Sequence, residues 1–163
     1  MDSTIPRDVE QYLTQVQIPV RVSGVTASGW PVVVSLWYLY RDGRLYCATQ
    51  STARIVEYLR HEPRCAFEIA SDQMPYCGVR WQGVAEIDAL QGEEVLERLL
   101  VRYTGDTSNS LAQNLLSRSE TEVAIIVRPV NIFTWDFTER MQNAVPLSMP
   151  GQRYCPPRQF DYI

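Results

Sequence analysis

The chain has 163 residues, a length that suits one domain able to bury a sizeable apolar core. Hydrophobic residues make up 45% and charged residues 21%, which indicates a globular rather than a disordered chain. The net charge of −4 argues against a nucleic-acid binder, whose surface is basic. No stretch is long and apolar enough to span a membrane, and the polar start does not resemble a secretory signal, so we expect a cytoplasmic protein without a membrane partner.

The residue counts also exclude several kinds of chemistry. All 15 basic residues are arginines, so the chain has neither a lysine for a Schiff base nor a P-loop lysine. With the single histidine His61 it cannot form a paired-histidine metal site, and we expect no metal. No zinc or redox spacing relates the cysteines, so in a cytoplasmic protein we expect four free thiols. They are Cys47, Cys65, Cys77 and Cys155.

The first third of the chain predicts a helix followed by strands. A short helix is expected over residues 5–15 of the N-terminal segment 1–18, with Pro6 in its first turn. Strands are expected over 20–27, 31–40 and 45–49. The second of these strands is almost wholly apolar, which is typical of a strand buried on both faces. The turn signal Asp42-Gly43 predicts a hairpin between the second strand and the third.

The remaining elements alternate between helical and extended patterns. Thr52 can cap a helix that ends before Pro63, and two helical stripes with a glycine C-cap at Gly105 come later. Pro129 marks a bulge or an edge in the last strand. The strands of this half are expected near 65–69, 79–87 and 123–137. Alternation in the second of these strands predicts two faces, one with Val79, Trp81, Gly83, Ala85 and Ile87 and the other with Arg80, Gln82, Glu86 and Asp88.

The tail over residues 142–163 contains four prolines, and we expect an extended arm. Its aromatic residues would anchor this arm as a lid over a ligand cleft. The prolines are Pro146, Pro150, Pro156 and Pro157.

Six strands in hairpin-rich order, with helices in the crossovers, predict one mainly β domain with helices over residues 1–163. This α+β pattern favours a small closed or nearly closed barrel. A two-layer sheet with helices on one side is the alternative.

A polar segment lies where the third strand passes into the following helix. It carries the hydroxyls of Thr49, Ser51 and Thr52 and the guanidinium of Arg54. Free backbone N–H groups at a helix start, together with an arginine, suit a phosphate group. The alternative is ordinary helix capping with Arg54 on a solvated face.

Aromatic residues on three strands could wall a planar ring system. These residues are Trp37, Tyr38, Trp81 and Trp135. The alternative for each of them is packing in the core of the barrel.

Three segments together resemble the pyridoxamine 5′-phosphate oxidase-like family of flavin-binding split barrels. The first runs from a Gly-Trp-Pro turn through an apolar strand and a DGRLY hairpin to the hydroxyl-x-Arg segment that opens the helix. The second is GVRWQGVAE, and the third is the closing strand VRPVNIFTWDF. Their order and spacing cover about residues 20–137. The resemblance implies a six-stranded split β-barrel with helical crossovers, which binds flavin in a cleft between two identical subunits.

The resemblance also implies which residues contact the cofactor. The phosphate would lie against Thr49, Ser51, Thr52 and Arg54, with Arg54 in the place where the family usually has lysine. The ring would lie along Ser35, Leu36 and Trp37, with Gln82 and Trp135 reaching it from the cleft between subunits.

The function implied is that of an FMN-dependent oxidoreductase acting on a small-molecule redox substrate that the sequence does not name. The cofactor carries the chemistry in such proteins, so we assign no catalytic side chain. The tail lacks the arginine pattern of the vitamin-forming oxidases, and we do not expect that activity. The alternatives are a deazaflavin-dependent reductase and a flavin- or haem-binding module without turnover.

Overall fold

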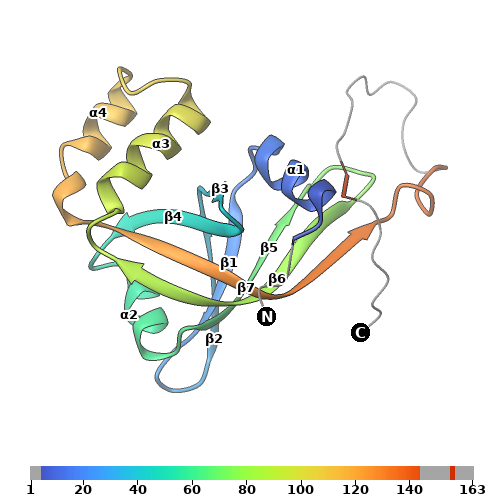
Figure 1. Ribbon diagram of the computed structural model, residues 1–163, viewed down its shortest axis with the longest axis horizontal. Coiled ribbons are helices and arrows are strands. Elements are labelled where there is room, and N and C mark those ends of the chain that lie inside the picture. The colour runs from blue at the N-terminus through green and yellow to red at the C-terminus, as the bar shows by residue number, and fades with distance from the viewer. Residues whose placement is uncertain (1–4, 144–154, 157–163) are drawn as a thin grey trace.

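Seven antiparallel strands form one curled sheet in the computed structural model, which describes residues 5–143 and 155–156 (Figure 1). The strands are β1 (Val20–Val25), β2 (Pro31–Leu36), β3 (Leu39–Arg41), β4 (Arg44–Gln50), β5 (Arg64–Ala70), β6 (Cys77–Asp88) and β7 (Glu122–Asp136). The helices are α1 (Arg7–Gln15), α2 (Arg54–His61), α3 (Gly92–Thr104), α4 (Ser110–Leu116) and the short 3₁₀ helix η1 (Ser119–Thr121). None of the described helices is long and apolar enough to cross a membrane.

The strand order in the sheet is β2-β1-β5-β6-β7-β4-β3, so β2 and β3 are its two edges. The prediction of a mainly β fold with helices is confirmed, although the sheet has seven strands instead of six. The difference arises because the apolar run 31–40 is two strands, separated at Trp37 and Tyr38.

The prediction that this run is buried on both faces is wrong. As an edge strand β2 alternates between exposed and half-buried residues. Tyr38 is fully buried where the chain crosses from β2 to β3, and its hydroxyl donates to the carbonyls of Leu13 and Val16 at 2.9 and 3.2 Å. The apolar residues of the run therefore belong partly to the edge strand β2 and partly to the crossover that leads from β2 to β3.

The concave face of the sheet encloses the main apolar core, and two helices close its opposite ends. The Tyr12 hydroxyl of α1 donates to the carbonyl of Ile69 near the end of β5, whereas α2 immediately precedes the start of β5. Strand residues at alternating positions point into this core, as the pattern on β6 predicted. The core includes Val22, Cys47, Phe67, Val79, Trp81 and Ile125 from the strands, and Leu13 and Leu59 from the two helices.

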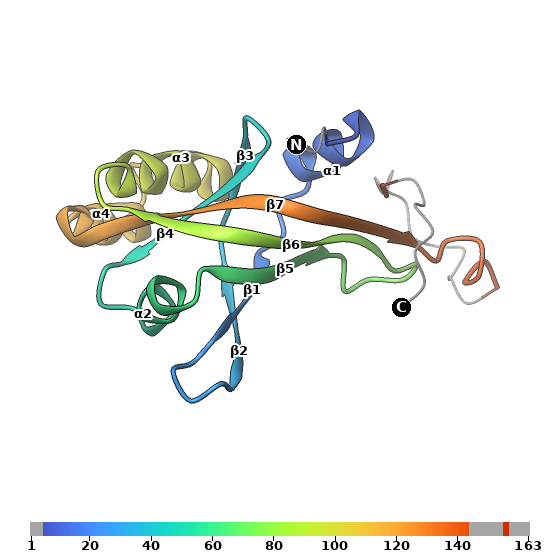
Figure 2. The ribbon, with the colours of Figure 1, turned by 60° about the horizontal axis from the view of Figure 1, so that its bottom comes forward.

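Helices α3 and α4 lie on the convex side of the sheet, over β4 and the first part of β7 (Figures 1 and 2). Tyr46, Ala124 and Ile126 pack there against Val95 and Leu99 of α3. None of the described helices covers the convex face of β2, β1, β5 and the second half of β7. This uncovered half is where the structure has a groove.

A β-bulge in β7 separates its two halves. Gln82 pairs with Asn131 and Gly83 pairs with Pro129, which leaves Val130 unpaired. The predicted bulge at Pro129 is thus confirmed. A Cβ atom on Gly83 would lie 2.7 Å from the carbonyl oxygen of Arg128, so the close approach of the two strands requires glycine at this position.

Cys77 and Cys155 form a disulfide, with their Cα atoms 5.7 Å apart. The prediction of four free thiols is therefore wrong for these two cysteines. Their separation of 78 residues hid the proximity that the folded chain creates. Of the tail, only Cys155 and the buried Pro156 are described beyond residue 143, so the predicted lid lies outside the described residues.

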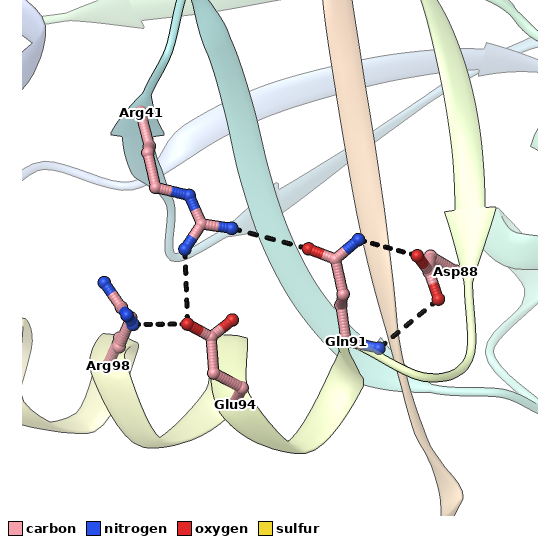
Figure 3. A network of polar contacts seen from close by, with 5 residues as sticks. All are labelled: Arg41, Asp88, Gln91, Glu94 and Arg98. Atoms are coloured by element: carbon pink, nitrogen blue, oxygen red, sulfur yellow. Dashed lines mark hydrogen bonds and ion pairs between the residues drawn. The ribbon is translucent and has the colours of Figure 1, made fainter.

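A polar network ties the β3 edge to α3 (Figure 3). Arg41 contacts Glu94 at 3.2 Å and Gln91 at 3.4 Å, and Glu94 also pairs with Arg98. The side-chain amide of Gln91 donates to Asp88 at 2.6 Å, and this contact lowers the pKa of the Asp88 carboxyl. The groups are partly exposed, so each ion pair contributes only about 0–1 kcal/mol, but together they align β3 with the start of α3.

We predict that alkylation will distinguish the two kinds of cysteine. Cys47 and Cys65 are free and buried, and burial raises their thiol pKa values to about 12 and about 11. Both thiols are therefore protonated and unreactive in the folded protein at neutral pH. Mass spectrometry after iodoacetamide treatment should find no adduct on the native chain, two on the unfolded chain and four after unfolding with reduction. Four adducts without reduction would contradict the disulfide.

We predict that Arg102→Ala will destabilise the fold more than Arg98→Ala on the same helix. Arg102 donates to the carbonyls of Thr14, Leu13 and Val16 at the end of α1, whereas Arg98 makes an exposed pair with Glu94. Loss of the charged donor should lower the free energy of unfolding by about 1.5–3 kcal/mol, against about 0–1 kcal/mol for the surface pair. Urea denaturation measures both, and equal losses would show that Arg102 does not hold α1.

Candidate functional site

The predicted phosphate residues lie together at the junction between β4 and α2. Thr49 is half-buried on β4 opposite Val123, and the backbone N–H of Ser51 donates to the carbonyl of Thr121 at 2.8 Å. The backbone N–H of Ala53 donates to Gln50 at 2.9 Å and closes a turn over residues 50–53. This turn fixes the backbone from which the hydroxyls project.

The first turn of α2 is open. Ala53 is the N-cap residue, and no side chain in the described part of the chain caps the helix N–H groups, so the prediction that Thr52 caps this helix is wrong. A free helix start carries unsatisfied N–H groups and the positive end of the helix dipole. Arg54 is the first helical residue and is exposed, and none of the described residues pairs with its guanidinium.

Gln50 does not belong to this donor set. Its side-chain amide donates to Glu122, and its amide oxygen accepts from the hydroxyl of Thr121. Both contacts hold the Gln50 side chain against the start of β7. Glu122 is buried, and this burial raises the pKa of its carboxyl.

The three residues predicted to line the ring, at the end of β2 and directly after it, do not lie together at one site. Ser35 is exposed on the convex face of the sheet opposite Arg21, whereas Leu36 packs against the main core. Trp37 stacks on Tyr103 of α3, with ring centroids 4.9 Å apart and planes 5° apart. Ser35 and Trp37 are thus both on the convex side, but Trp37 is covered by α3, and only Ser35 of the three lies on the uncovered half where the groove is.

Gln82 and Trp135 lie on that convex face as well. The Gln82 side chain accepts a hydrogen bond from the Asn131 amide at 2.8 Å and lines a groove of about 590 Å³. Trp135 is half-buried opposite Gly78, and the guanidinium of Arg80 lies 5.8 Å from its ring. A Cβ atom on Gly78 would lie 2.8 Å from the Trp135 ring, so this contact requires glycine.

The two groups of predicted residues are far apart in one chain. Thr49 pairs with Val123 and Gln82 pairs with Asn131, and both partners are on β7. Eight positions of an extended strand separate these partners, which is roughly 25 Å. One chain therefore holds two separate groups of candidate residues, which we call the two half-sites, one at the β4–α2 junction and one on the convex face.

Sequence reasoning missed the charged residues of the groove. Arg21, Glu68 and Arg80 stand side by side on β1, β5 and β6, in direct cross-strand register. The alternation of β6 had placed Arg80 beside Gln82 on one face. The partners from β1 and β5 depend on strand register, which the sequence does not reveal. The described residues contain no cluster of three or more acidic, cysteine or histidine side chains that could hold a metal ion.

Comparison with known proteins identifies the fold. The structure resembles the conserved hypothetical protein Rv2991 of Mycobacterium tuberculosis, with a TM-score of 0.70 and 20% identity over 92% of this chain and 94% of that one. It resembles an F420 reductase, with a TM-score of 0.66 and 20% identity over 78% and 98% of the two chains. A third is a Listeria innocua protein provisionally named a pyridoxamine 5′-phosphate oxidase, with a TM-score of 0.57 and 18% identity over 78% and 92%.

The fold is that of the pyridoxamine 5′-phosphate oxidase-like split barrels. No protein-family model matches the chain, and no curated protein matches its sequence. The assignment therefore rests on structure and covers the architecture of the split barrel. The cofactor and substrate have to be argued from the site.

Proposed function

We propose that this split barrel binds FMN and acts as an oxidoreductase on a small-molecule redox substrate. The observation that carries the proposal is the unpaired Arg54 at the uncapped start of α2. Arg54 is accompanied by three hydroxyls, that of Thr49 just before the turn over residues 50–53 and those of Ser51 and Thr52 within it. A guanidinium, hydroxyls and free helix N–H groups are the donors that a phosphate monoester accepts.

The donor set fits a phosphate and would select for it. Capping side chains usually satisfy a helix start, and here none does, so an anion can take their place without displacing a protein contact. Gln50 is held by Thr121 and Glu122 and does not compete for the site.

We propose that the flavin ring is held by the second half-site, on the convex face, of another copy of the chain. Because roughly 25 Å of strand separates the two half-sites, Gln82 and Trp135 reach a ligand anchored at Arg54 only from a second subunit. We therefore propose a homodimer with an isologous interface, in which each flavin lies between two chains.

A bound flavin would accept and deliver a hydride or electrons at its ring. The residues of this chain would bind and orient it. Arg54 and the hydroxyls would fix the phosphate, Ser35 and Gln82 would meet the polar edge of the ring, and Trp135 would shield it from water. The groove residues Arg21, Glu68 and Arg80 would then face whatever substrate enters beside the ring.

A deazaflavin coenzyme is the second candidate, and the structural likeness to an F420 reductase favours it. Its longer polyanionic tail suits a more basic surface than a chain with a net charge of −4 offers. The absorbance spectrum of the purified protein separates flavin, deazaflavin and haem. Steady-state oxidation of a nicotinamide donor then separates an oxidoreductase from a binding module without turnover.

We predict that Arg54→Ala will weaken FMN binding about tenfold or more, because a charge-assisted hydrogen bond contributes about 1.5–3 kcal/mol. Riboflavin, which lacks the phosphate, should bind the variant and the parent protein equally. Arg60→Ala is the matched control, since Arg60 is an exposed arginine in the last turn of the same helix. Fluorescence titration measures all of these affinities. Equal FMN affinity of the Arg54 variant and the parent would remove the phosphate assignment.

We predict that two defective subunits will restore one intact site. An Arg54→Ala chain and a Trp135→Ala chain, co-expressed with different tags, should give a heterodimer in which one of the two sites has both residues. FMN titration should then show parental affinity at half of the sites. If each site instead lies within one chain, the heterodimer has two singly defective sites and no tight component. A protein that stays monomeric and still binds FMN tightly would also exclude the shared site.

A further inference from the structure

Two rows of side chains cross the convex face, and all of their members except Ser35 and Asn131 line the 590 Å³ groove. They come from five neighbouring strands in direct register, which fixes their order across the sheet. One row is Ser35, Arg21, Glu68, Arg80 and Phe133, and the other is Val33, Ser23, Ala66, Gln82 and Asn131. The first row is charged at its centre, whereas the second is small, polar or apolar.

The two guanidiniums of the charged row lack carboxylate partners. Among the described residues no ion pair joins Arg21 or Arg80 to Glu68, although Glu68 stands between them. Two positive groups and one negative group leave the row with one uncompensated positive charge. A charge that becomes covered by a ligand or a second subunit is costly unless it is paired.

A second groove of the same volume provides a comparison for the unpaired arginines. It lies beside the β3 edge and also contains two arginines, Arg41 and Arg98, with a volume of about 590 Å³. Both of those arginines contact Glu94, at 3.2 and 2.5 Å. The chain therefore satisfies its arginines in one groove and leaves them available in the other.

The groove also holds one guanidinium in a fixed place and offers apolar contacts beside it. Arg80 lies 5.7 Å from the ring of Phe133 and 5.8 Å from that of Trp135, so two aromatic faces orient it by cation–π attraction. Val33, Ala66 and Phe133 line the groove next to the charged row. An oriented guanidinium beside an apolar wall suits a planar carboxylate that is attached to an apolar body.

We propose that this groove binds a small organic monoanion, a carboxylate with an apolar body, through Arg80 and Arg21. The assignment of this anion as the substrate of the redox site rests on the proposed function. Anion binding itself does not require the flavin. The carboxylate completes the charge balance of the row, and Glu68 then accepts a hydrogen bond from a donor group of the substrate.

The test compares 2-naphthoate with its neutral isostere 2-naphthamide, by calorimetric titration of the full chain without flavin. The acid should bind about tenfold more tightly than the amide, since the carboxylate gains charge-assisted hydrogen bonds. Arg80→Gln should reduce this preference to less than about twofold, and Arg21→Gln should reduce it in part. Arg44→Gln, at an exposed arginine of the β3–β4 hairpin, is the matched control and should leave the preference unchanged.

The proposal would be overturned by equal affinity for acid and amide, by no detectable binding of the acid, or by an equal loss in the Arg44 control. Loss of acid binding as the protein dimerises would show that a second copy covers the groove and would overturn it as well. FMN titration of the same proteins keeps the two proposals apart. If the protein binds naphthoate but not FMN, the flavin proposal is refuted. If it binds FMN but not naphthoate, only the anion site is refuted.

Discussion

The antiparallel pairing of β6 with β7 is the constraint on which the rest of the structure depends. These two strands are the longest in the sheet, with 12 and 15 residues, and their pairing runs from Cys77 to Asp88. The bulge opposite Gly83 bends the ladder, because an extra residue on one strand increases the local twist. The first half of β7 can then pack under α3 while its second half faces the groove.

The same ladder separates the two half-sites and gives them different chemistry. At the β4–α2 junction the donors are backbone N–H groups, hydroxyls and one exposed guanidinium, which suits a compact anion such as a phosphate. On the convex face the donors are side chains that project from neighbouring strands beside apolar residues, which suits a larger planar ligand. This division of donor types is the reason for proposing a ligand with a phosphate at one end and a planar ring at the other.

The sequence was sufficient for patterns that arise locally. The alternation over residues 79–87 put Trp81 on the same face as Val79, Pro129 marked the bulge, and Gly105 was the expected C-cap of α3, with a φ of +88°. These features depend on periodicity or on backbone freedom at one residue. The polar segment around Arg54 was also found this way, because a helix start and its polar residues are neighbours in the chain.

The features that were missed depend on contacts between distant segments. The row of Arg21, Glu68 and Arg80 requires the register of three strands, and a shift of one residue would turn these side chains to the other face. The continuous apolarity of the run 31–40 predicts one buried strand, whereas its residues form an edge strand and then a crossover. The disulfide was excluded by an argument from cellular compartment, which carries no information about proximity.

The Cys77–Cys155 bond also changes what a break in the chain would do. It closes a covalent ring that contains β6, α3, α4 and all of β7, so any single cut of the backbone inside this ring leaves both pieces attached. Both pieces would run as one species on a denaturing gel until a reductant is added. The longest ladder of the sheet thus lies within a segment that proteolytic nicking does not release.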